Sequence, residues 1–180
     1  MKLKSLLFLF TLFFLGYSEV NAQRKKVINY TEISALIQAG TSQSGNANLN
    51  GFRTRTGVSK LVSENFGLGF ALGTDNYKTS AGRTYNTLPL TLNASYFLDP
   101  ELSGLKVDFY GGYAVKLFNN LNKGLTAGAG LSYSFPVNGG LNLGIQTGYN
   151  YQKIDYPANF VLDNSFDIGS IRLGLGITFK

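Results

Sequence analysis

Residues 124–135, GLTAGAGLSYSF, and residues 141–151, LNLGIQTGYNY, alternate strictly between an apolar residue and a small or polar one. The four-residue turn Val137–Gly140 joins them. Because successive side chains of a β-strand point to opposite faces, each stretch predicts a strand with one apolar and one polar face. Together they predict a long antiparallel hairpin. The face that points inward decides between a soluble barrel with an apolar core and a membrane barrel with an apolar exterior.

The composition excludes several classes of function. The chain has 180 residues, a formal net charge of +6, no His and no Cys. Catalytic Ser-His-Asp and Cys-His arrangements and the usual zinc sites therefore cannot form, and we expect no catalytic residue, no cofactor and no metal. The basic residues are scattered, so no nucleic-acid partner is expected. Four carboxylates near the longer loops are expected to be solvated acids or strand-end caps: Asp75, Asp155, Asp163 and Asp167. Carboxylate- or lysine-dependent catalysis through them, as in a lipid-modifying enzyme, is the alternative.

The N-terminus has the pattern of a secretory signal peptide. Lys2 and Lys4 precede an apolar run from Leu6 to Leu15, and a more polar segment ends at Ala22. We expect residues 1–22 to be a signal peptide cleaved after Ala22, and residues 23–180 to form one barrel domain. The apolar run is shorter than the roughly 20 residues that a membrane-spanning helix needs. No later stretch is long and apolar enough for such a helix.

Period-two alternation predicts eight strands in an all-β, antiparallel, up-and-down transmembrane barrel. Their expected ranges are Tyr30–Gly40, Gly51–Leu61, Phe66–Asp75, Tyr85–Leu98, Leu105–Leu117, Gly124–Phe135, Leu141–Lys153 and Phe166–Phe179. Tight turns at 62–65, 99–104 and 137–140 alternate with connections that are longer on average, at 41–50, 76–84, 118–123 and 154–165. Outer-membrane barrels have an even strand number, short periplasmic turns and longer outside loops.

Aromatic residues are expected to form two girdles at the two membrane interfaces. The first lies on the short-turn side (Phe66, Tyr96, Tyr133, Phe135, Phe179) and the second on the loop side (Tyr77, Tyr85, Tyr149, Tyr151, Phe166). The last expected strand keeps an apolar face down to Phe179, followed by Lys180. This ending resembles the C-terminal signature by which outer-membrane barrels are recognised for assembly, and implies the barrel-assembly machinery as a partner.

With the apolar faces on lipid, the polar faces line the lumen. The lumen is then expected to hold a cluster of charged residues of both signs: Glu32, Arg53, Arg55, Asp108, Lys116 and Arg172. Buried ions are tolerable where they pair and form hydrogen bonds. The opposite orientation, with aliphatic rows inside, is the alternative of a soluble, lipocalin-like periplasmic barrel that binds a small apolar ligand.

Pro89 falls within the fourth expected strand, where it removes a ladder hydrogen bond and predicts a local irregularity. The surrounding stretch, residues 88–97, LPLTLNASYF, resembles a recurrent segment in small outer-membrane β-barrel proteins of Bacteroidota. The Ala22-Gln23 junction also resembles signal cleavage sites of that group. The resemblance implies an integral barrel of the OmpA/OmpX-like, eight-stranded type without a periplasmic domain, in the outer membrane of a Gram-negative bacterium.

An eight-stranded barrel is just wide enough for side chains to fill, so a large diffusion channel is not expected. The expected role is structural or surface interaction, with outer-membrane lipid and lipopolysaccharide around the barrel and a possible ligand at the loops. The expected contact residues lie in the last loop: Tyr156, Pro157 and Phe160. A narrow pore or an accessory barrel of a secretion apparatus is a further alternative.

Overall fold

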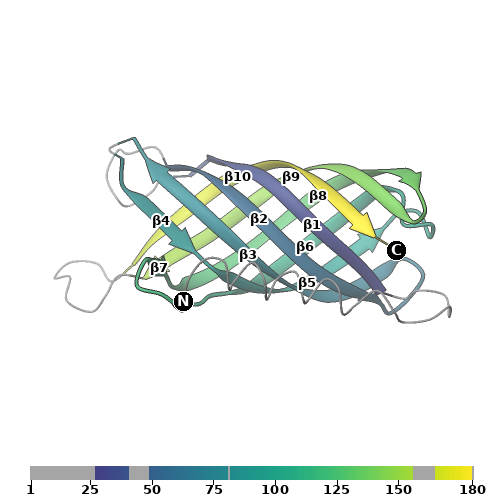
Figure 1. The fold of residues 1–180 in the computed structure, drawn as a ribbon, viewed down its shortest axis with the longest axis horizontal. Helices are drawn as coiled ribbons and strands as arrows, with labels where there is room; N and C mark the ends of the chain where they lie inside the picture. The colour runs from purple at the N-terminus through teal and green to yellow at the C-terminus, as the bar shows by residue number, and fades with distance from the viewer. Residues whose placement is uncertain (1–26, 41–48, 81, 156–164, 180) are drawn as a thin grey trace.

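The computed structural model describes residues 27–40, 49–80, 82–155 and 165–179, which form a closed, all-β barrel (Figure 1). Its strands are β1 Val27–Gln38, β2 Leu49–Leu61, β3 Phe66–Thr79, β4 Thr84–Thr87, β5 Pro89–Phe97, β6 Gly104–Ala114, β7 Leu121–Asn122, β8 Gly124–Asn138, β9 Leu141–Asp155 and β10 Ser165–Phe179. Antiparallel neighbours follow the ring β1-β2-β3-β5-β6-β8-β9-β10, and the pairing of β10 with β1 closes it. The expected eight-stranded, up-and-down barrel is confirmed.

The hairpin predicted at 124–151 is formed by β8 and β9. The register is continuous from Thr126 opposite Gln152 to Pro136 opposite Asn142. The expected four-residue turn is wrong, because β8 continues to Asn138 through an irregularity after Pro136. The remaining turn has φ angles of 58° at Gly139 and 86° at Gly140, as in the two-residue turns whose twist suits a hairpin.

The structure also changes the expected ends of β3 and β6. β3 runs on to Thr79 because its last residues pair with β4, so the loop expected at 76–84 is only the connection 80–83. β6 ends at Ala114, three residues before the expected end. The chain then leaves the sheet, and β7 returns beside β4 as its parallel neighbour.

The irregularity predicted at Pro89 is confirmed. The strand expected over Tyr85–Leu98 is divided into β4 and β5 at Leu88. The Val115 amide donates to the Leu88 carbonyl at 3.0 Å, so Leu88 is bonded toward the β6 side. In an antiparallel ladder the next residue turns its amide toward the other neighbour, β3, and Pro89 has no hydrogen to donate there.

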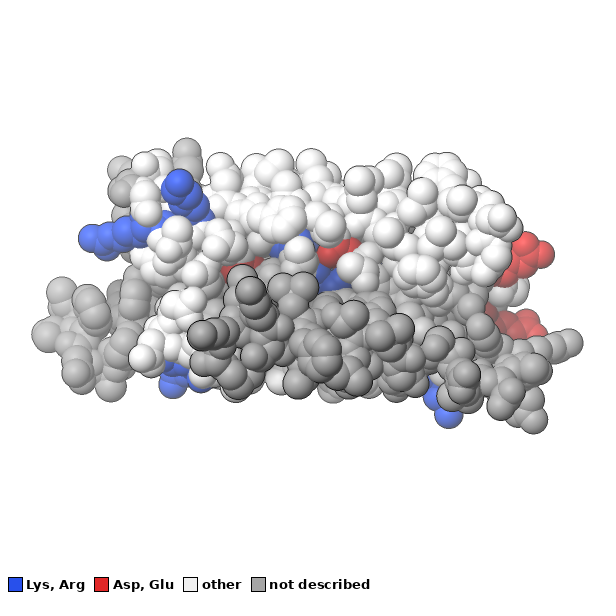
Figure 2. Space-filling model, viewed as in Figure 1, with Lys and Arg blue, Asp and Glu red and all other residues white. Residues whose placement is uncertain are grey.

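The barrel has an apolar exterior and a polar interior. Leu92, Leu175 and Phe109 are among the exposed large apolar side chains, at 74%, 66% and 57% exposure, whereas the long strands turn charged and amide side chains inward. On the face shown in Figure 2, the charged atoms of the described residues lie mainly near the two ends of the barrel. A small group lies about half way along its length. No helix within the described ranges is long and apolar enough to cross a membrane.

The short-turn girdle faces outward, with Tyr96, Tyr133, Phe135 and Phe179 about half exposed. The loop-side girdle is only partly present, because Tyr149 and Tyr151 face outward while three of its expected members do not. Tyr77 and Phe166 are buried inside the barrel, and Tyr85 packs against them. The strand period explains this correction: Tyr77 is in phase with the inward-facing Asp75, and Phe166 with the inward-facing Ile168.

Candidate functional site in the barrel interior

The structure brings five of the six residues expected in the lumen into the barrel interior. Glu32, Arg53, Arg55, Asp108 and Arg172 are each at most 4% exposed. They come from β1, β2, β6 and β10, so strands far apart in the sequence meet at one level of the barrel. The expected placement of the sixth residue, Lys116, in the lumen is wrong.

Lys116 is exposed and lies beyond the end of β6. Lys106 is the β6 lysine that faces inward, and its Nζ lies 3.9 Å from Glu32 Oε1. The period-two phase of β6 could have selected it, because Lys106 shares a face with Asp108. Asp75 was expected to be a solvated or capping acid and is instead buried on the inward face of β3.

Arg53 and Asp75 form a two-pronged ion pair at positions that face each other on β2 and β3. Arg53 Nε donates to Asp75 Oδ1 and Arg53 Nη2 donates to Oδ2, both at 2.6 Å. Arg53 Nη1 donates to the Tyr110 hydroxyl, which donates to Asn150 Oδ1 at 2.6 Å. Asn150 Nδ2 then donates to the Tyr77 hydroxyl at 2.8 Å. This chain of polar groups crosses the lumen from β2 through β6 to β9 and returns to β3.

A second cluster joins two arginines and two carboxylates. Arg55 Nε donates to Glu32 Oε2 at 3.0 Å, and Arg172 Nη2 donates to Asp108 Oδ2 at 3.2 Å. The two pairs are linked, because Arg55 Nη2 lies 3.9 Å from Asp108 Oδ2 and Arg172 Nη1 lies 4.0 Å from Glu32 Oε2. Shared partners of opposite charge lower the cost of keeping these ions out of water.

Tyr110 is the centre of the interior. The guanidinium carbons of Arg55, Arg53 and Arg172 lie 4.6, 5.1 and 5.3 Å from its ring centroid, within the range of cation–π attraction. Gly128 on β8 gives this ring its space, since a Cβ atom there would overlap the Tyr110 hydroxyl. Glycines on the polar face therefore allow large side chains from other strands to fill the lumen.

Apolar clusters close both ends of this polar interior, a feature that strand alternation did not predict. The loop-side cluster contains buried residues from β1, β2, β3, β9 and β10: Leu36, Leu49, Tyr77, Ile154, Phe166 and Ile168. The turn-side cluster contains Ile28, Phe97 and Leu102, with Leu61 against them. Apart from Leu102, which lies in a turn, these residues are in phase with the lumen-facing residues of their strands, so strand phase combined with distance from the strand centre could have found them.

Leu102 shows how a turn helps to close one end. Its φ of 61° is left-handed, which is unfavourable for a side-chain-bearing residue, yet its side chain is 7% exposed in the turn-side cluster. Asn142 Nδ2 donates to the Leu102 carbonyl at 2.9 Å, which fixes the turn to β9. Next to Glu32 and Lys106 there is a cavity of about 10 Å³, about the space of one water molecule.

Several predicted features lie outside the described residues: the signal peptide, Asp163, and the loop contacts Tyr156, Pro157 and Phe160. The other two loop-side acids accept phenol hydrogen bonds, Asp167 from Tyr151 at 2.8 Å and Asp155 from Tyr113 at 3.3 Å. Within the described ranges, no three His, Cys, Asp or Glu residues are grouped so that they could hold a metal ion.

Known proteins are similar to this chain in fold. No family model and no curated protein sequence matches it. Among solved structures it is similar to Neisserial surface protein A, with 18% identity and a TM-score of 0.49, over 85% of this chain and 96% of that one. It is also similar to the outer membrane protein OprG from Pseudomonas aeruginosa, with 14% identity and a TM-score of 0.43, over 85% and 95%. A de novo designed transmembrane β-barrel has 16% identity and a TM-score of 0.43, over 88% and 99%.

Proposed function

We propose that the protein is an integral outer-membrane β-barrel with a structural or surface-interaction role and no catalytic role. The observation that carries this proposal is the orientation of the strand faces. Leu92, Phe109 and Leu175 face outward, while Arg53 and Arg172 are buried in ion pairs. A transmembrane barrel in lipid requires this orientation. A soluble lipocalin-like carrier of an apolar ligand would require an apolar centre where this barrel has its ion pairs.

The membrane and the direction of insertion are part of the proposal. The sequence supports export through its expected signal peptide over residues 1–22, and supports outer-membrane assembly through the apolar face that ends at Phe179. The resemblance of residues 88–97 favours the Bacteroidota type. In this proposal the short turns face the periplasm, and the connections that include 39–48 and 156–164 face the exterior of the cell.

The closed interior favours a role at the barrel surface over transport through the lumen. The loop-side and turn-side clusters lie at the two ends, with the ion pairs between them. A narrow pore would need a continuous polar path past both clusters. We therefore propose that contacts with a ligand or partner are made by the outside loops, with Tyr156, Pro157 and Phe160 as the contact residues.

Cell fractionation tests the membrane assignment. We expect the full chain to remain in the membrane pellet after alkaline or high-salt washing and to need detergent for extraction. A folded barrel should migrate faster on a gel when unheated than when boiled. Release of the protein with the periplasmic fraction, with no heat-dependent shift, would overturn the proposal and favour the soluble carrier.

Replacing residues 156–164 with a short Gly/Ser linker tests the surface role. The heat-dependent gel shift of this variant establishes that the barrel still forms, and adhesion or ligand capture by whole cells is then compared with the parent chain. The matched control is replacement of the connection 80–83. We expect a loss only when 156–164 is replaced, and unchanged capture in that variant would remove this loop from the proposal.

A further inference from the structure

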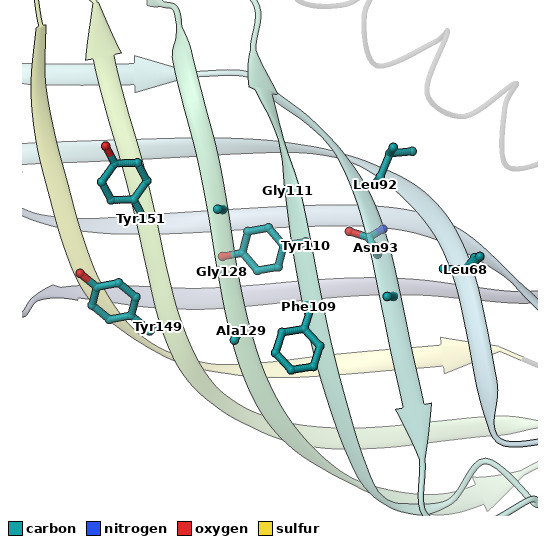
Figure 3. A pocket seen from close by; sticks show the side chains of 12 residues that line it. Leu68, Leu92, Asn93, Phe109, Tyr110, Gly111, Gly128, Ala129, Tyr149 and Tyr151 are labelled. Atoms are coloured by element: carbon teal, nitrogen blue, oxygen red, sulfur yellow. The ribbon is translucent and has the colours of Figure 1, made fainter.

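A small polar pocket lies inside the barrel, on the turn side of the central ion pairs. Its space is the cavity of about 10 Å³ next to Glu32 and Lys106. The depression of about 560 Å³ around Phe109 is a different feature, because it lies on the outer wall and faces lipid in the proposed function (Figure 3). The lumen pocket, in contrast, is lined by charged and hydrogen-bonding side chains.

Three polar side chains stand side by side along one wall of this pocket. Lys106 on β6 is opposite Ser132 on β8, and Ser132 is opposite Gln146 on β9. All three residues line the cavity. Most of the remaining lining consists of small residues nearer the turns: Ser134, Gly144, Gly176 and Thr178. The strand register therefore places a row of hydrogen-bond donors next to the cavity.

Two of these groups have donor capacity that the described residues leave unused. The Ser132 hydroxyl is buried and has no hydrogen-bond partner among those residues. Lys106 Nζ lies 3.9 Å from Glu32 Oε1, which is within ion-pair range but beyond hydrogen-bond range. The Lys106 side chain is 14% exposed, so solvent and small ions can reach it. A ligand that accepts hydrogen bonds would satisfy both groups.

The charge of the lumen favours an anion at this position. Three cations and two carboxylates share the ion cluster around the pocket: Arg55, Arg172 and Lys106, with Glu32 and Asp108. Their formal charges sum to +1, since three cations face two anions. Glu32 also lines the pocket, but all three cations lie within 4.0 Å of it and offset its charge. Because an unbalanced charge is costly away from water, an anion next to Lys106 would stabilise the cluster.

We infer that the pocket binds one chloride ion, held between Lys106 Nζ and the Ser132 hydroxyl with the Gln146 amide beside them. A cavity of about 10 Å³ holds one species of about the size of a water molecule, so phosphate, sugars and organic acids are too large. In the proposed orientation the ion enters from the periplasmic side. The site goes beyond the proposed surface role, because it does not involve the outside loops.

Anomalous scattering tests the position of the ion. Crystals of the full chain are grown in sodium bromide, because bromide replaces chloride and gives an anomalous signal. We expect a peak in the lumen between Lys106 Nζ and Ser132 Oγ. A pocket that holds only water would give no peak at this position, and that result would overturn the inference.

Urea unfolding in vesicles of neutral lipid tests the effect of the ion on stability. Sodium chloride is compared with sodium gluconate at the same ionic strength, because gluconate is too large for the pocket. A ligand that binds only the folded protein raises the folded-to-unfolded ratio about tenfold when its concentration is about ten times its dissociation constant. We expect a saturable rise of this kind in chloride. Equal unfolding midpoints of the parent chain in the two salts would overturn the site.

Two variants assign the chloride effect to the pocket. Lys106→Gln removes the charge. Ser132→Ala removes a hydroxyl that has no partner among the described residues, so this variant keeps the contacts of the barrel itself. The matched control is Lys60→Gln, which removes an exposed lysine of β2.

The heat-dependent gel shift establishes that each variant is folded. We expect the chloride effect to be lost in Lys106→Gln, to weaken severalfold in Ser132→Ala and to stay unchanged in Lys60→Gln. A chloride effect of equal size in all three variants would overturn the pocket as its source.

Discussion

Asp75 and Arg53 carry opposite charges where neither side chain reaches solvent. Removing one partner leaves the other charge buried, so we expect Asp75→Ala to lower the free energy of unfolding by about 3–5 kcal/mol. Urea titration in lipid vesicles measures this change through the heat-dependent gel shift and circular dichroism. These signals replace Trp fluorescence, because the chain has no Trp. Glu64→Ala, which removes an exposed carboxylate from a turn, is the control and should cost less than about 0.5 kcal/mol.

The paired variant separates charge from packing. With both partners replaced, as in Arg53→Met with Asp75→Leu, no unpaired ion is left in the barrel. We expect this double variant to be more stable than Asp75→Ala alone, because apolar replacement of a whole buried pair is often close to neutral. A double variant that loses as much stability as Asp75→Ala would show that the ion pair is not the cause of the loss.

Two glycines on neighbouring strands provide a matched comparison. A Cβ at Gly128 would overlap the Tyr110 hydroxyl and the Tyr149 carbonyl, whereas a Cβ at Gly111 meets no atom within 4 Å. We expect Gly128→Ala to cost about 1–3 kcal/mol by displacing Tyr110, and Gly111→Ala to leave the unfolding midpoint unchanged or slightly higher. The measurement is the same urea titration. Equal effects at the two positions would contradict a filled interior centred on Tyr110.

At the scale of elements, β10 carries the apolar face that resembles an assembly signature. Phe179 is 46% exposed at the end of this strand, opposite Asn29 of β1 and Leu141 of β9. We expect Phe179→Ala to lower the fraction of heat-shifted protein in cells severalfold while having little effect on spontaneous folding in detergent. Leu175→Ala on the same face is the control. Equal losses in cells for both variants would indicate a general loss of apolar surface.

Strand phase is the part of this structure that sequence reasoning predicted best. The alternation at 124–151 predicted the hairpin of β8 and β9 and the two faces of its strands, and Pro89 marked the break between β4 and β5. The same phase places Asp75, Lys106 and Tyr77 on the lumen side of their strands. Asp75 and Tyr77 are expected at the loop side only because they lie near a loop. The predicted placement of Lys116 in the lumen is wrong, because alternation cannot show where a strand leaves the sheet. The strand leaves the sheet after Ala114. Arg53 with Asp75 and Arg55 with Glu32 are opposite each other on neighbouring strands, so the register of two hairpins would have paired them. The contacts of Arg172 with Asp108 and of Arg53 with Tyr110 cross the lumen and depend on ring closure, so no local pattern could predict them.

The described residues form a barrel whose interior is filled by its own side chains. We expect the purified chain to give no stable single-channel steps in planar lipid bilayers, because the clusters around Leu36 and Phe97 close the two ends and Tyr110 fills the middle. A porin measured in the same bilayers is the positive control, and the gel shift confirms that the inserted protein is folded. Regular conductance steps from the parent chain would favour the narrow-pore alternative.

Ring closure through β1 and β10 has a consequence for folding kinetics. Pairs such as Asn29 with Phe179 and Ala35 with Leu173 join strands from the two extremes of the described chain, so the contact order of the barrel is high and slow folding is expected. Until these pairs form, β1 and β10 have unpaired backbone groups that hydrocarbon cannot satisfy. Entry of the strands into the bilayer and closure of the ring must therefore be concerted, and an intermediate arrested between the two would be exposed to edge-to-edge aggregation.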